Sequence, residues 1–95
     1  MPAYLVVEIE VLNAERFAEY RQLVPTLLEA FGGRYLVRGG SLETLEGDWQ
    51  PQRLVVVEFP SVEQARRWWN SSEYAEAKAL RQAATNTRMV VVEGV

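Results

Sequence analysis

The stretch Arg53–Phe59 reads RLVVVEF, and it carries the strongest β-strand signal in the chain, because β-branched residues dominate it and Pro60 ends it. Ala3–Val11, AYLVVEIEV, has the same character. Successive side chains of a strand point to opposite faces of a sheet. One face would then carry Leu5, Val7, Ile9, Val55, Val57 and Phe59. The other would carry Tyr4, Val6, Glu8, Leu54, Val56 and Glu58.

The residues after Pro60 predict helices and a last strand. Ser61 and Gln64 form a capping-box pair at the start of a helix that runs through Ala65, Trp68 and Trp69. Asn70-Ser71-Ser72 interrupts it, and Ser71 or Ser72 is expected to cap a further helix. This second helix would contain Tyr74, Ala77, Leu80 and Ala84, and Thr87–Glu93 would follow as a strand.

The region before Arg53 predicts a helix and one further strand. Asn13 is the expected N-cap of an amphipathic helix that would end near Gly32 in a left-handed cap. Pro25 lies inside this helix, where it removes the hydrogen bond to the carbonyl of Arg21 and predicts a kink. The predicted core positions of this helix are Phe17, Tyr20, Val24, Leu27 and Phe31.

A short strand is predicted over residues 33–38, GRYLVR. Gly39-Gly40 indicates a bulge, a bend or a close backbone approach. The segment 41–52 is polar, and Leu42 and Leu45 suggest that part of it continues as a strand or hairpin arm.

The resulting order is β-α-β-β-α-β over one domain, residues 1–95, which is the ferredoxin-like arrangement. We therefore expect an α+β fold, with an antiparallel sheet that has both helices on one face. The other face is too apolar for water, so we expect a homodimer in which two sheets pack face to face. Glu8 and Glu58 on this face need cations, and Arg34, Arg38, Arg53 and Arg88 are the available partners. The alternative is a polar pocket in which a glutamate with raised pKa acts as acid or base.

Composition excludes several classes of site. The chain has no cysteine and no histidine, which excludes disulfides, thiolate nucleophiles and Ser-His-Asp catalysis, and we expect neither a metal nor a cofactor. The net charge is −3, which disfavours nucleic acid as a partner. No segment has the layout of a signal peptide or membrane span, so we expect a cytoplasmic protein that does not bind membranes.

Several strings resemble one family. Gly32–Gly40, GGRYLVRGG, is similar to the signature of the bacterial domain-of-unknown-function family numbered 1330. Arg53–Ser61, Ala65–Tyr74, Arg81 and the VVEG string that ends at Gly94 fit the same pattern in the same order. The resemblance implies a ferredoxin-like fold of the dimeric α+β barrel type, and it implies no activity. Trp69 stands where Tyr or Phe is expected, and Ser72 where Pro is common.

The same topology serves several functions, and the residues disfavour most of them. RNA recognition needs stacking aromatics on the central strands, and Arg53–Phe59 offers aliphatic residues with one aromatic at the strand end. Cysteines for metal transfer, a glycine-rich loop after the first strand for acyl phosphates and a histidine for haem are missing. Our first hypothesis is that the protein binds a small anionic or aromatic molecule between sheet and helices. The alternatives are a cofactor-independent isomerase or oxygenase and a purely structural dimer module. The residues proposed for a ligand site are Arg38, Glu58, Trp69, Asn70, Tyr74 and Arg81.

Overall fold

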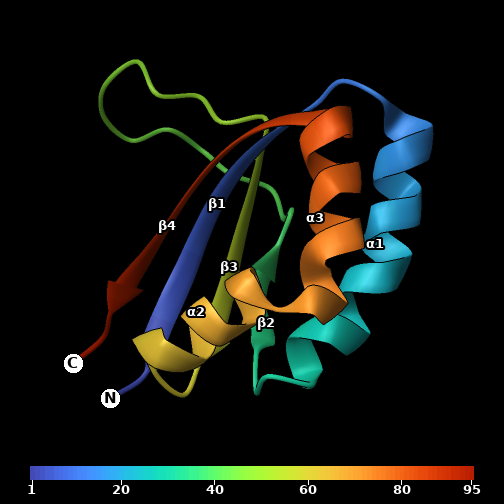
Figure 1. Cartoon of the computed structure of the whole chain (residues 1–95). Helices are drawn as coiled ribbons and strands as arrows, with labels where there is room; N and C mark the ends of the chain where they lie inside the picture. The colour runs from blue at the N-terminus through green and yellow to red at the C-terminus, as the bar shows by residue number, and fades with distance from the viewer.

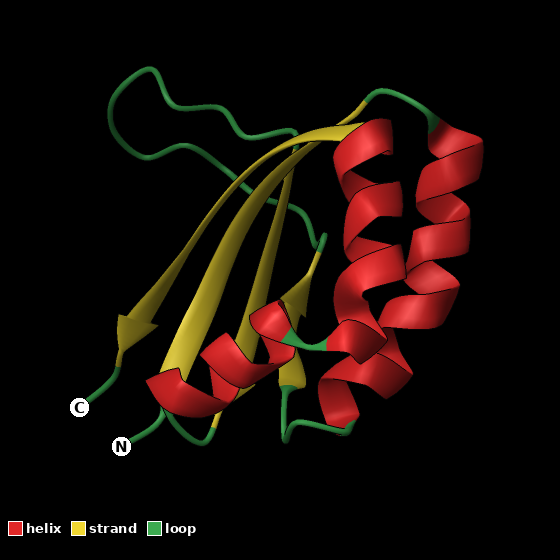
Figure 2. Cartoon of the chain, viewed as in Figure 1, coloured by secondary structure: helices red, strands yellow, loops and turns green.

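The structure is a computed structural model that describes all 95 residues. Its elements are β1 (Ala3–Val11), α1 (Ala14–Glu29), β2 (Arg34–Arg38), β3 (Arg53–Phe59), α2 (Val62–Asn70), α3 (Ser72–Ala84) and β4 (Thr85–Glu93). The strands form one antiparallel sheet in the order β2-β3-β1-β4. All three helices cover one face of the sheet and leave the other open (Figures 1 and 2). The predicted ferredoxin-like fold is confirmed. None of the helices has both the length and the apolar character that a membrane crossing requires.

The core lies between the sheet and the helices, and the alternation of the strands selects its members. Every predicted inward position of β1 and β3 is buried, whereas their outward neighbours are half-buried. From the helical side, Trp68 and Tyr74 are the largest fully buried side chains, with ring centroids 4.0 Å apart. Trp69, its neighbour, is only partly buried, as expected for adjacent helical residues that point about 100° apart.

Side chains cap all three helices at their N-termini. Asn13 Oδ1 accepts from the amide of Arg16 (3.1 Å), Ser61 Oγ from Gln64 (3.1 Å), and Ser71 Oγ from Tyr74 (3.1 Å). The predicted capping box is only half formed, because the Gln64 side chain donates to the carbonyl of Phe31 instead. That bond ties α2 to the turn after α1. Gly32 takes the expected left-handed backbone (φ 81°) in this turn.

An irregularity in β2 decides where its arginines point. Tyr35 pairs with Val57 and Arg38 with Val55, but the register between them shifts at Leu36. Without this bulge Arg34 and Arg38, four residues apart, would share one face. With it, Arg34 stays on the open face and Arg38 is directed toward the helices, where it contacts α1. At Gly39-Gly40, where a bulge, a bend or a close backbone approach is predicted, the structure has a bend at Gly39 and a close approach by the Arg53 side chain, while the bulge lies at Leu36.

The segment 39–52 is a long loop without a strand, so the predicted hairpin arm is wrong. Leu42 and Leu45 are exposed and form no apolar stripe that could pack against the sheet. The loop extends from the end of the sheet, away from α1 and α3 (Figure 1). Gly39 begins it with a left-handed backbone (φ 73°) that glycine favours.

Candidate functional site

A small apolar cavity lies between the sheet and the helices. Its free volume is about 30 Å³, and its walls are the inward side chains of β1 and β3 together with α1. Polar side chains enter it from five elements. They are Tyr20 and Arg21 from α1, Tyr35 and Arg38 from β2, Arg53 from β3, Trp68 from α2 and Arg81 from α3. The lining contains four arginines and no carboxylate.

A proline in α1 positions the arginine of β2. Pro25 has no amide hydrogen, so the carbonyl of Arg21, four residues earlier, loses its helical partner. Nη2 of Arg38 donates to this carbonyl at 2.8 Å. The Arg38 guanidinium also lies 4.5 Å from the centroid of the Tyr35 ring. An exposed arginine is thus held in place at the edge of the cavity.

Arg53 lies deeper, because it shares the inward side of β3 with Val55 and Val57. Its guanidinium lies 5.4 Å from the Phe17 ring centroid and packs on Gly39, where any Cβ would overlap it. Its Nε is buried and has no hydrogen-bond partner in the chain. Burial, followed by repulsion from Arg21 and Arg38, lowers the pKa of Arg53 below its ordinary value.

Arg81 occupies the other side of the cavity and is only 3 % exposed. Its Nε donates to the hydroxyl of Tyr74 at 3.3 Å, and that hydroxyl is 2.9 Å from the hydroxyl of Tyr20. Nη2 of Arg81 and Nε1 of Trp68 are buried without a partner in the chain. Burial is the main cause that raises the pKa of Tyr20, so its hydroxyl stays protonated at neutral pH.

None of the four cavity arginines is neutralised by a carboxylate. The chain forms two ion pairs, Arg34–Glu58 and Arg88–Glu8, each with a 2.7 Å contact, and both lie on the open face. A buried donor left unpaired costs about 1–3 kcal/mol, and a charged donor costs more. The cavity therefore favours a negatively charged group that accepts hydrogen bonds.

The structure brings together only part of the predicted ligand-site set. Arg38 and Arg81 line the cavity, and the buried Tyr74 supports Arg81 from behind. Trp69 lies beside it, with its ring centroid 5.9 Å from the guanidinium of Arg81. Glu58 is on the opposite face of the sheet, bound to Arg34, because alternation directs it away from the helices. Asn70 is exposed at the end of α2 and does not reach the cavity.

Sequence reasoning missed Arg21, Tyr20 and Trp68 as lining residues and considered Arg53 only as a partner for the open-face glutamates. A signal for Arg53 exists in the sequence. It shares the alternation of Val55 and Val57, so an arginine is predicted on the apolar side of the sheet. The sequence also shows that the carbonyl of Arg21 lacks a helical partner, because Pro25 four residues later has no amide hydrogen. Nothing local indicates which donor will bind this carbonyl.

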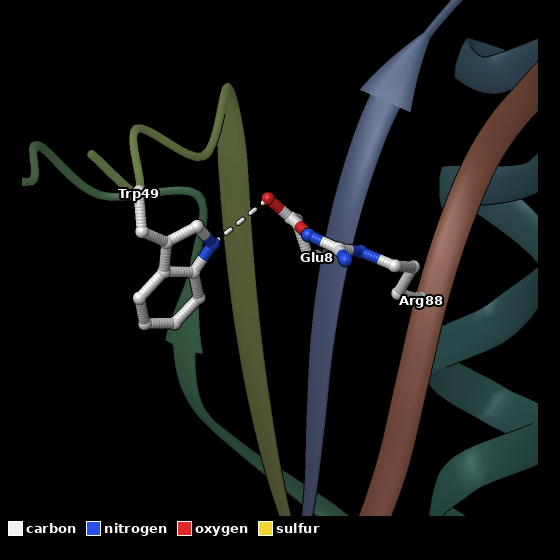
Figure 3. A network of polar contacts seen from close by, with 3 residues as sticks. All are labelled: Glu8, Trp49 and Arg88. Carbon is white, nitrogen blue, oxygen red and sulfur yellow. Dashed lines mark hydrogen bonds and ion pairs between the residues drawn. The ribbon is translucent and has the colours of Figure 1, made fainter. Parts of the chain in front are cut away.

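A second polar group lies on the open face of the sheet. Glu8 accepts from Nε1 of Trp49 at 3.0 Å and from Nε of Arg88 at 2.8 Å, so the long loop is anchored to β1 and β4 (Figure 3). The hydrogen bond from Trp49 is the main cause that lowers the pKa of Glu8, followed by the bond from Arg88. In the single chain this shift is opposite in direction to the raised pKa that a glutamate acting as acid or base would need.

Solved structures share this fold. A protein of unknown function from Rhodopseudomonas palustris superposes with a TM-score of 0.81 at 22 % identity, over 99 % of this chain and 82 % of its own. A dimeric ferredoxin-like protein of unknown function from Jannaschia sp. superposes with a TM-score of 0.73 at 13 % identity, over 99 % of this chain and 100 % of its own. A cofactor-independent oxygenase from Streptomyces nogalater superposes with a TM-score of 0.68 at 12 % identity, over 99 % of this chain and 93 % of its own.

Comparison of the sequence with known proteins assigns a family but no activity. The curated proteins give no significant match. One family profile, described as Domain of unknown function (DUF1330), matches residues 2–95.

Proposed function

We propose that this chain, which belongs to the DUF1330 family of domains of unknown function, binds a small organic anion in the cavity between its sheet and helices. One observation carries the proposal. Arg21, Arg38, Arg53 and Arg81 line a single apolar cavity, and none of them is paired with a carboxylate. A bound anion would relieve the mutual repulsion of the cations and would accept from donors that are otherwise buried unpaired.

The cavity also favours binding over the two alternatives, a purely structural dimer module and a cofactor-independent enzyme. A module that only associates is expected to have a solid interior near Arg38, yet Arg38 lines the cavity. A cofactor-independent enzyme needs an acid or base at the ligand. The lining offers no carboxylate for that role, and Lys78 is engaged elsewhere, with Nζ 2.8 Å from the carbonyl of Trp69. Tyr20 and Tyr35 are the lining groups that remain, and burial raises the pKa of both, which disfavours the ionised form that a general base requires. Binding is thus the function that these residues support best.

We further propose that the protein is a homodimer in which the open faces of two sheets pack together. The face is formed by partly exposed apolar residues from three strands, namely Tyr4, Val6, Leu54, Val56, Val90 and Val92. Its carboxylates Glu8 and Glu58 are each paired with an arginine of the same chain. A partner would therefore cover apolar surface without leaving Glu8 or Glu58 unpaired, and Glu10, exposed near the end of β1, accepts a hydrogen bond from Asn86.

Anion binding is tested by following backbone amide NMR signals during titration with benzoate, benzenesulfonate and phenylphosphonate. We expect at least one of these anions to shift signals of residues around the cavity. Arg53→Gln should weaken that binding by about tenfold or more, because it removes a charge-assisted donor. Arg16→Gln is the matched control, since it makes the same change on an exposed part of α1 that does not line the cavity.

Two results would reject the proposal. One is that none of the three anions shifts the cavity signals at millimolar concentration. The other is that Arg16→Gln weakens binding as much as Arg53→Gln, which would indicate general attraction to surface charge.

A further inference from the structure

The unpartnered polar atoms of the cavity are all hydrogen-bond donors. The buried side-chain atoms without a partner in the chain are Arg53 Nε, Trp68 Nε1 and Arg81 Nη2. All three residues line the same cavity. Guanidinium and indole groups donate hydrogen bonds and cannot accept them. The protein therefore presents donors to whatever enters, and a ligand group that itself donates finds few acceptors there.

The tyrosines change this balance little. The hydroxyl of Tyr20 is already engaged with that of Tyr74, 2.9 Å away. The other hydroxyl in the lining belongs to Tyr35. Burial is the main influence on its pKa and raises it, whereas the nearby cations Arg38, Arg21 and Arg53 act in the opposite direction. A hydroxyl surrounded by cations is best placed to turn its oxygen toward them. The cavity as a whole is therefore complementary to a ligand group that accepts hydrogen bonds.

The size of the cavity limits which acceptor can enter. Its free volume of about 30 Å³ is room for about two water-sized groups. A carboxylate is planar and presents two oxygen atoms, whereas sulfonate and phosphonate are tetrahedral and present three. The rest of a ligand would lie toward Arg21 and Arg38, which line the cavity and are exposed to solvent.

We infer that the ligand is a carboxylate, whose two oxygens fill the cavity and accept hydrogen bonds from its arginine and tryptophan donors. This inference rests on the proposed anion-binding function and names the chemical class of the ligand. The body of the ligand extends toward Arg21 and Arg38. A neutral amide of the same shape is rejected, since its amino group would face donors.

The test compares four probes that share one phenyl ring: benzoate, benzenesulfonate, phenylphosphonate and benzamide. Dissociation constants are measured on the wild-type protein by the same NMR titration at pH 8 and constant ionic strength. We expect benzoate to bind at least about tenfold more tightly than each of the other three. Phenylphosphonate carries more negative charge than benzoate at this pH, so simple attraction to the arginines predicts the opposite order.

A pair of variants tests the role of the guanidinium donors. Arg81→Lys keeps the charge but removes Nη2, and it should abolish the preference for benzoate over phenylphosphonate. Arg66→Lys, an exposed change on α2, should keep that preference. Amide spectra confirm that each variant is folded, and the wild-type comparison decides the question if Arg81→Lys does not fold.

The outcomes separate the two proposals. If benzenesulfonate, phenylphosphonate or benzamide binds within about tenfold of benzoate or more tightly, the carboxylate inference is overturned, and anion binding is then decided by the Arg53→Gln test. If no probe binds, both proposals are overturned.

Discussion

At the scale of single residues, Glu8 shows how one hydrogen bond from a loop tunes a carboxylate. Its pKa lies below the ordinary value of 4.5, mainly because Trp49 donates to it and then because Arg88 does. The folded-state pKa is thus depressed. The resulting stabilisation is present above about pH 4.5 and is lost as the pH falls through the folded-state pKa. We expect Trp49→Phe to raise the pKa of Glu8, measured by an NMR titration of its side-chain carboxyl.

The matched control for this residue is Leu45→Ala, which changes the same loop at a 90 % exposed position without touching Glu8. It should leave the titration of Glu8 as in the wild type. A Glu8 pKa that does not move in Trp49→Phe would show that the indole bond does not form in solution.

At the scale of elements, α1 and β2 are linked through Pro25. The proline frees the carbonyl of Arg21, and that carbonyl holds Arg38 at the cavity. Pro25→Ala restores an amide donor inside the helix, so the helix bond competes with Arg38. We expect the variant to be more stable toward denaturant by about 1–3 kcal/mol, since proline is strongly unfavourable in a helix interior. Anion binding should weaken by roughly threefold to tenfold, because Arg38 loses its preorganised position.

Thr26→Ala, one residue along the same helix and exposed, should alter neither quantity beyond about 0.5 kcal/mol. The combination of higher stability with weaker binding is the diagnostic result. Unchanged binding in Pro25→Ala would mean that Arg38 does not depend on the freed carbonyl for its position.

At the scale of the whole molecule, the open sheet face determines assembly. Val56 lies in β3, paired with Val6 of β1, and both strands are internal to the sheet. We expect native mass spectrometry and sedimentation to give a dimer for the wild type at micromolar concentration. Val56→Lys should give a monomer, because an unpaired charge would be buried in the interface.

Leu23→Lys makes the same kind of change at an exposed apolar residue of α1, on the helical side, and should remain a dimer. A wild-type monomer, or a Val56→Lys variant that still dimerises, would contradict packing through this face.

Local patterns in the sequence determined most of the architecture. Alternation in β1 and β3 assigned each side chain to the core or to the open face. Asn13 and Ser61 marked two helix starts, and the third was narrowed to Ser71 or Ser72, of which the structure selects Ser71. These features depend on neighbours within a few residues, so they can be interpreted without a tertiary structure. The loop 39–52 is the exception, because Leu42 and Leu45 suggest a strand there, but both are exposed and no partner strand pairs with them.

Only the tertiary structure decided the candidate site. The bulge at Leu36 directs Arg38 inward, and a bulge depends on pairing with β3. The carbonyl of Arg21 meets a donor seventeen residues away, and Tyr20 and Tyr74 meet across fifty-four. The sequence determined that the chain has nine arginines and which strand positions face inward. Their convergence on one cavity required the folded sheet, because the contacts that bring charges together are long-range and leave no periodic trace in the chain.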